Sequence, residues 1–158
     1  SEHDYLTLPR RALFDRLGMA SAVLETDAAG TFVGAAWAYA SARDWARFGL
    51  LYLRDGVWNG ARLLPPGWVK LSTTPAAGAS DYGAQFWLRV PWPYRPVHGP
   101  APALPRDAFH AVGHYGQFVS VFPALDLVVV RLGLARGHAW DHEAFLATLL
   151  PAFTGKTP

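Results

Sequence analysis

Residues 109–134 read FHAVGHYGQFVSVFPALDLVVVRLGL and contain three short apolar runs separated by turn signals. The runs predict strands over residues 109–113, 117–122 and 127–134, with a tight turn at residues 123–126. The third run is almost continuously apolar, which is typical of a strand covered on both faces. The segment HYGQ (114–117) lies between the first two runs. The rigid strands on either side would fix the position of the imidazole, and the glycine would let a ligand approach the backbone closely.

Helical spacing of apolar residues predicts helices on both sides of this stretch. After a polar lead-in, Pro9 is suited to the first turn of a helix, and Gly18 is suited to end it. Ser41 and Asp44 resemble a capping box at the start of a second helix, and Asp141 is the expected N-cap of the last one. The expected helices cover residues 9–17, 42–54, 68–72 and 140–153.

Other stretches are expected to be extended or irregular. Residues 19–39 look extended around a turn at residues 27–30, and residues 82–90 predict a strand. Residues 91–107 hold six prolines without periodicity, which indicates a long irregular loop. The sequence contains no repeat and no internal boundary, so residues 1–158 are expected to form a single domain. The predicted fold class is α+β, an antiparallel sheet with packed helices.

Composition narrows the class of protein. The chain of 158 residues has 51% hydrophobic residues, a net charge of +2 and no cysteine. Disulfides and thiolate metal sites are therefore excluded, and the absence of a Lys/Arg run argues against a nucleic-acid partner. Apolar stretches are too short for a membrane span, and the localisation stays open. The chain begins without Met, which indicates a piece of something longer or a processed chain.

Four histidines form pairs at a spacing that metal sites also use. His110 and His114 are four residues apart, and so are His138 and His142. Either pair could start a zinc site, but neither has an evident third ligand, and the run after His142 lacks the second histidine of a zinc-protease helix. Ordinary surface histidines are the favoured interpretation, with no metal and no other cofactor.

Five stretches of the sequence, taken together, point to a known family. They are LFDRLGM (13–19), ETDAAGTFVG (25–34), ASARDWARFGLLYLRDGVWNGARLLPPGWV (40–69), YGAQFWL (82–88) and GHYGQFVSVFPALDLVVVRLG (113–133). Together they resemble the C-terminal part of serine beta-lactamase-like hydrolases. The resemblance is to the branch that holds class C beta-lactamases, DD-peptidases, related esterases and 6-aminohexanoate-oligomer hydrolases, and it covers nearly the whole chain in the family's order.

That family uses three site motifs, and only one of them is in this chain. They are S-x-x-K with the nucleophile, Tyr-x-Asn, and K-T-G or its H-x-G variant on a strand. The third matches residues 114–116, whereas no serine has Lys three residues later and no tyrosine has Asn two residues later. In the family both missing motifs precede the LFDRLGM-like helix. The chain thus resembles a partial beta-lactamase/transpeptidase-like fold that lacks its N-terminal elements and its nucleophile.

The resemblance also implies roles for the third motif. His114 would help to polarise the proton relay or bind substrate, and the backbone N–H of Gln117 would be an oxyanion donor. Gly116 would keep the strand edge open. Tyr115 stands where the family usually has a small Thr and would contact substrate at the mouth of the site, which weakens the case for a beta-lactam.

The implied function is that of the C-terminal portion of a serine hydrolase. Such an enzyme acts on an ester, amide or beta-lactam carbonyl through an acyl-enzyme, with a small acyl molecule as substrate. The chain alone is expected to be inactive. Two alternatives remain, a non-catalytic ligand- or partner-binding fragment and a metal-dependent hydrolase that uses the histidine pairs. The far edge of the strand at residues 127–134 is expected to pair with a second copy or with the N-terminal fragment of the same enzyme.

Overall fold

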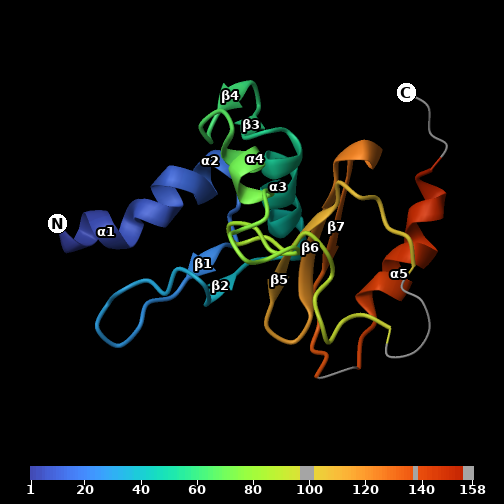
Figure 1. The fold of residues 1–158 in the computed structure, drawn as a ribbon. Helices are drawn as coiled ribbons and strands as arrows, with labels where there is room; N and C mark the ends of the chain where they lie inside the picture. The colour runs from blue at the N-terminus through green and yellow to red at the C-terminus, as the bar shows by residue number, and fades with distance from the viewer. Residues whose placement is uncertain (97–101, 137–138, 155–158) are drawn as a thin grey trace.

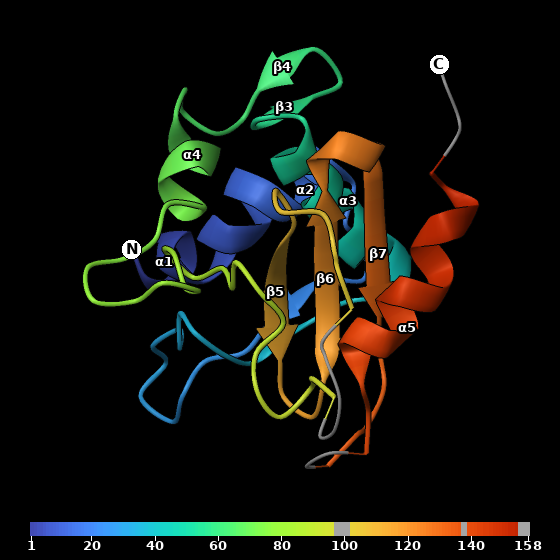
Figure 2. The same cartoon turned by 45° about the vertical axis from the view of Figure 1, so that its right-hand side comes forward.

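A computed structural model describes residues 1–96, 102–136 and 139–154. Its centre is an antiparallel sheet of three strands, β5 (Phe109–Gly113), β6 (Gln117–Phe122) and β7 (Leu127–Arg131), in the order β5-β6-β7. Helix α3 (Ala42–Leu53) covers one face of the sheet and helix α5 (His142–Leu149) covers the other, as Figure 1 shows. The strands lie side by side in Figure 2. The predicted α+β class is confirmed, and the predicted bounds of β5 and β6 agree with the structure.

Alternation along β6 assigns its side chains to the two faces. Phe118, Ser120 and Phe122 point toward α5, whereas Val119 and Val121 point toward α3. Phe118 and Phe122 are at most 1% exposed, and the burial of such a ring typically contributes about 1.5–3 kcal/mol. The neighbouring strand β7 is also covered on both faces, because Val129 belongs to the α5 side and Val128 to the α3 side. The continuous apolar run predicted this double cover.

Helix α3 begins as predicted, but the carboxylate of Asp44 in its first turn binds a residue outside the helix and not the backbone N–H of Ser41. The Ser41 side chain accepts a hydrogen bond from the backbone N–H of Asp44, as an N-cap should. The Asp44 carboxylate accepts hydrogen bonds from the backbone N–H and the hydroxyl of Ser21, at 2.8 and 2.5 Å, and pairs with Arg47. It therefore joins α3 to the segment before it, and the box that the sequence predicted is only half formed.

The first helix begins earlier than predicted. Helix α1 (Glu2–Pro9) starts at Ser1, which forms a full capping box with Asp4. Pro9 lies inside the helix, and because it has no N–H the chain continues as a π-helical segment, η1 (Arg10–Phe14), before α2 (Asp15–Leu17). The predicted lead-in at residues 1–8 was therefore wrong. The predicted end was right, since Gly18 has φ 70° and is the left-handed cap.

Three predicted extended segments are shorter in the structure. Residues 82–90 form only isolated bridges, one of which pairs Trp87 with His110 of β5, because Gln85 has φ 70° and interrupts the extended chain. Strand β7 ends at Arg131, whose partner is Phe118, so only Gln117 of β6 is left beyond this pair for residues 132–134. Residues 19–39 contain only two-residue strands around the predicted turn.

The remaining elements are short, and four of them form two-stranded pairs. Two 3₁₀ turns follow β6 and α5, and helix α4 has the bounds that the sequence predicted. No helix in the described part of the chain is long and apolar enough to cross a membrane. These elements are β1 (Val23–Leu24), β2 (Ala38–Tyr39), β3 (Val57–Trp58), β4 (Ala61–Arg62), α4 (Trp68–Ser72), η2 (Pro123–Leu125) and η3 (Leu150–Ala152).

Candidate active site

The residues that match the third family motif form the turn between β5 and β6. Tyr115 and Gly116 both have positive φ, 56° and 76°, so the chain reverses through a left-handed turn. His114 is the first residue of this turn and its side chain is exposed. The imidazole is therefore carried by the turn that joins β5 to β6, between the two strands as the predicted strand bounds place it.

Two hydrogen bonds and the neighbouring ring of Tyr94 hold the backbone of this turn in place. The carbonyl of Tyr115 accepts a hydrogen bond from the N–H of Ala135 at 2.9 Å, and the carbonyl of Gly116 accepts one from the guanidinium of Arg131. A Cβ on Gly116 would lie 2.9 Å from the ring of Tyr94, which is too close for any other residue. The close approach that the glycine permits is thus made by the chain's own Tyr94.

The side chains of the turn are near one another. The rings of His114 and Tyr115 have their centroids 3.8 Å apart, and the guanidinium of Arg136 lies 5.3 Å from the Tyr115 ring. The side-chain amide of Gln117 donates to the carbonyl of His114 at 3.2 Å. The backbone of Gln117 lies opposite Gly113 at the end of the β5–β6 ladder. The turn thus presents an accessible imidazole, which can bind an anion or move a proton.

The other paired histidines lie elsewhere. His110 and His142 are 1% and 0% exposed and lie on the α5 side of the sheet, so the interpretation of these two as surface residues was wrong. Both bind Ser120, at 2.8 and 2.9 Å. Burial lowers the pKa of His110 to about 3. The pKa of His142 is also lowered to about 3, mainly by burial and to a smaller extent by the charges of His110 and Arg131.

The structure separates the histidines that the sequence had paired. His110 is buried and His114 is exposed on the turn. His138 lies outside the described residues. Among the residues that are described, no three His, Asp or Glu side chains are grouped as a metal site would require.

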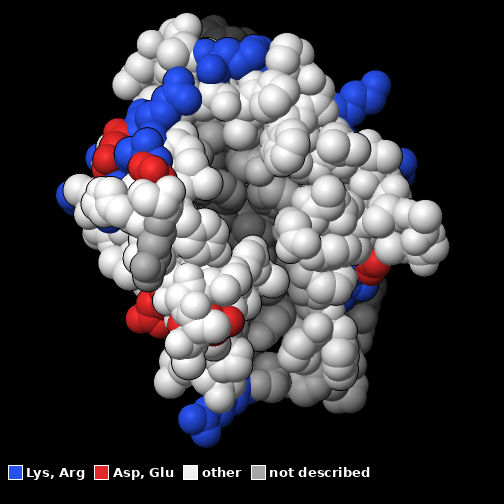
Figure 3. Space-filling model, turned by 90° about the vertical axis from the view of Figure 1, so that its left-hand side faces the viewer, with Lys and Arg blue, Asp and Glu red and all other residues white. Residues whose placement is uncertain are grey.

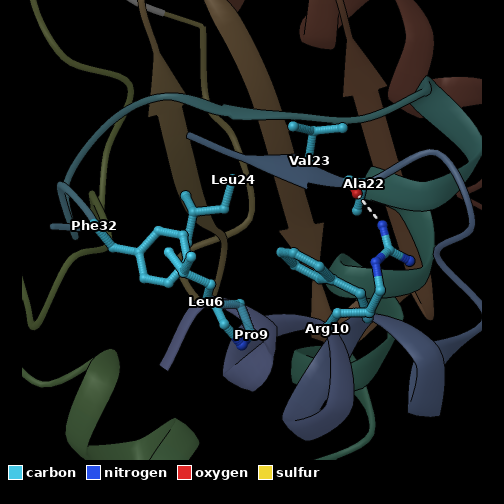
Figure 4. A pocket seen from close by; sticks show the side chains of 8 residues that line it. Leu6, Pro9, Arg10, Ala22, Val23, Leu24 and Phe32 are labelled. Carbon is cyan, nitrogen blue, oxygen red and sulfur yellow. Dashed lines mark hydrogen bonds between the residues drawn. The ribbon is translucent and has the colours of Figure 1, made fainter. Parts of the chain in front are cut away.

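Residues 114–117 line neither of two cavities found in the described part of the fold. One, of about 160 Å³, lies between the N-terminal helices and β1 and includes Arg10, which donates to the carbonyl of Ala22 (Figure 4). The other, of about 370 Å³, lies beside the end of α5. On the side of the molecule that holds the N-terminus, charged side chains lie mainly toward the rim (Figure 3). Sequence analysis pointed to neither cavity.

Comparison with known families identifies the fold. A family model described as Beta-lactamase matches residues 1–144. The chain therefore belongs to the beta-lactamase family, and thus to the serine beta-lactamase-like hydrolases. The predicted resemblance is confirmed.

Solved structures give the same result at the level of the fold. A Bacillus anthracis protein provisionally designated a 6-aminohexanoate-dimer hydrolase has 25% identity and a TM-score of 0.63, and the match covers 89% of this chain and 35% of that one. A beta-lactamase from Mycobacterium bovis has 20% identity and a TM-score of 0.64, over 98% and 64%. A Bacteroides dorei protein provisionally designated a beta-lactamase has 14% identity and a TM-score of 0.58, over 90% and 49%. A search of the curated proteins found no match.

The matched structures are longer than this chain. The 158 residues span about a third to two thirds of their lengths. The chain thus corresponds to part of a family fold, in agreement with the predicted partial fold.

Proposed function

We propose that residues 1–158 form the C-terminal portion of a serine hydrolase that acts on an ester, amide or beta-lactam carbonyl through an acyl-enzyme. The observation that carries the proposal is the family match over residues 1–144, together with an exposed imidazole on the β5–β6 turn. The chain contains no S-x-x-K and no Tyr-x-Asn segment. The nucleophile and its base are therefore proposed to come from another part of the complete protein.

The chemistry assigns a distinct task to each part. A serine hydroxyl from outside this chain attacks the substrate carbonyl, its proton passes to a base, and a tetrahedral oxyanion forms. The leaving group departs with a proton, and a water molecule then releases the acyl group and regenerates the serine. In this scheme His114 polarises the proton relay or binds the substrate, and the N–H of Gln117 donates to the oxyanion. Tyr115 contributes to the wall against which the substrate lies, and Gly116 lets the chain turn beneath the ring of Tyr94.

The proposed partners follow from the same scheme. The substrate is a small acyl molecule, and the second part of the site comes from the N-terminal segment of the same enzyme or from another copy. Among the described residues, β7 is paired only with β6, so its other edge has backbone groups available for such a segment. This edge is the proposed contact.

The test replaces His114 in the complete enzyme. His114→Ala is expected to lower kcat/KM for an activated ester by about 10²–10⁴-fold, the usual contribution of a proton-transfer group. The matched control is His3→Ala on α1, which is also exposed and is expected to leave kcat/KM unchanged. Full activity of His114→Ala would remove this residue from the site. A complete protein without hydrolytic activity would instead favour a non-catalytic binding role.

A further inference from the structure

A row of hydrogen bonds runs through the buried interface between the sheet and α5. The indole N–H of Trp140 lies 3.2 Å from Nδ1 of His142, and Nε2 of His142 lies 2.9 Å from the hydroxyl of Ser120. The same hydroxyl lies 2.8 Å from Nδ1 of His110 on β5. Ser120, His110 and His142 are at most 1% exposed. One serine oxygen thus links two imidazoles that come from opposite sides of an interface.

The chemistry of the groups fixes the direction of every hydrogen bond. An indole N–H can only donate, so Nδ1 of His142 accepts and the proton of a neutral His142 is on Nε2. Nε2 of His142 therefore donates to Ser120. The hydroxyl has one proton, and its remaining partner is Nδ1 of His110, which must accept it. Both imidazoles are consequently neutral, with the proton on Nε2, and a proton added to either ring at Nδ1 would remove an acceptor.

We propose that this row is an acid-labile lock that fastens α5 to the sheet, and that α5 opens when both imidazoles take up protons. The geometry supports the lock because His142 is the first residue of α5 and its ring stacks on Phe118 of β6, with centroids 3.6 Å apart and planes 12° apart. Opening would also uncover the apolar cluster that includes Phe122 and Leu146. The inference does not depend on the proposed catalytic function.

Some charged groups around the lock oppose the protonation of the histidines or the opening of α5, and the neighbouring elements contribute them. Arg131 of β7 lies over Trp140, and its charge disfavours a proton on His142. On α5, Glu143 pairs with Arg95 at 3.7 Å, and Asp141 caps the helix. The sequences of β5 and β6 place no other titratable side chain on this face. Burial raises the pKa of Glu143, so opening would release a proton there and would oppose the effect of the histidines.

The sign of the pH dependence follows from these pKa values. Each imidazole has a pKa of about 3 in the closed state and an ordinary value of 6.5 when it is exposed. The two neutral imidazoles thus contribute their full stabilisation of the closed state above pH 6.5, and this stabilisation is lost as the pH falls from 6.5 toward 3. Between pH 8 and pH 5 each histidine should increase the opening equilibrium by about thirtyfold, and both together by about a thousandfold.

Hydrogen exchange of the complete protein measures this equilibrium. The protection factor of the Leu146 amide on α5 is to be followed from pH 8 to pH 5 in the wild type and in His142→Gln, which cannot take up the second proton. The protection factor of the wild type is expected to fall about thirtyfold further than that of the variant. Glu143 is present in both proteins, so its contribution cancels. His3→Gln, on the exposed surface of α1, is the matched control and should show the same pH dependence of the protection factor as the wild type.

Nitrogen NMR of the wild-type imidazoles gives a second test that needs no variant. At pH 7 both His110 and His142 are expected to be neutral, with the proton on Nε2. A proton on Nδ1 of either ring, or a charged ring, would overturn the assigned directions. Equal pH dependence of the Leu146 protection factor in the wild type and in His142→Gln would overturn the lock itself. If His142→Gln does not fold, His110→Gln provides the same comparison.

Discussion

Asp44 is a buried carboxylate that joins α3 to the segment before it. Its carboxylate is 4% exposed and binds the N–H and hydroxyl of Ser21, and those hydrogen bonds lower its pKa. Asp44→Ala is expected to reduce the free energy of unfolding by about 2–3 kcal/mol, since hydrogen bonds to a charged group are lost. Urea unfolding measures this, with the exposed Glu25→Ala as a control that should change stability by less than about 0.5 kcal/mol. Equal stability of Asp44→Ala and wild type would contradict this role.

A lowered carboxyl pKa also has a defined effect on acid stability. The contribution of Asp44 is fully present above its ordinary pKa of 3.8 and is lost as the pH falls through the lower value of the folded protein. Asp44→Asn should therefore lose stability relative to wild type at pH 7, with the difference narrowing only below about pH 4. Urea titrations at pH 7 and pH 3 would show this, and a constant difference would contradict it.

The sequence could indicate single residues when their partners were close along the chain. Ser41 was found as a cap because its partner, Asp44, is three residues away. Ser21 was not found as the partner of Asp44, because only the tertiary fold brings it there. For the same reason His110 looked like a surface residue. In the folded sheet His110 lies on the same face as Ser120 and Phe118, and this shared face could have indicated that His110 is buried. Recognising it requires the pairing register of the two strands, which only the folded sheet provides.

Helix α3 packs so closely on the sheet that one of its positions requires glycine. A Cβ on Gly49 would lie 2.6 Å from Val128 and 2.9 Å from Val119. Gly49→Ala gains up to about 1 kcal/mol of helix propensity, but the overpacking should outweigh it and destabilise the fold by about 1–3 kcal/mol. Gly34→Ala, where a Cβ meets nothing within 4 Å, is the control and should be nearly neutral. Thermal unfolding measures both, and an unchanged Tm for Gly49→Ala would show that the interface is looser than described.

Elements were predictable where local signals and tertiary contacts agree. The bounds of β5, β6 and α4 agreed because turn residues delimit each one. Helix α1 was missed although Ser1 and Asp4 have the same spacing as Ser41 and Asp44, because Pro9 suggested a later start. The strand expected at residues 82–90 is interrupted by the positive φ of Gln85. Just before it, Gly83 lies against the backbone of Ser72, where a Cβ would be 2.2 Å from the carbonyl oxygen.

At the scale of the whole molecule, the edge of β7 leads to a prediction about assembly. Its strand is covered on both faces but, in the described part of the chain, has a neighbour only on the β6 side. The isolated chain is therefore expected to associate through this edge. Light scattering after size-exclusion chromatography should give a mass above the 17.3 kDa of one chain. A 17.3 kDa species that unfolds cooperatively, with rapidly exchanging amides at residues 128–130, would contradict the need for a partner.

We propose that this chain forms one wall of an acyl-transfer site whose nucleophile lies elsewhere in the complete protein. Fluorophosphonate labelling followed by peptide mass spectrometry tests it most directly, because the reagent marks activated serines. The isolated chain is expected to remain unlabelled at all of its serines, and the complete enzyme to be labelled at a serine outside residues 1–158. Stoichiometric labelling of any serine within residues 1–158 would contradict the claim.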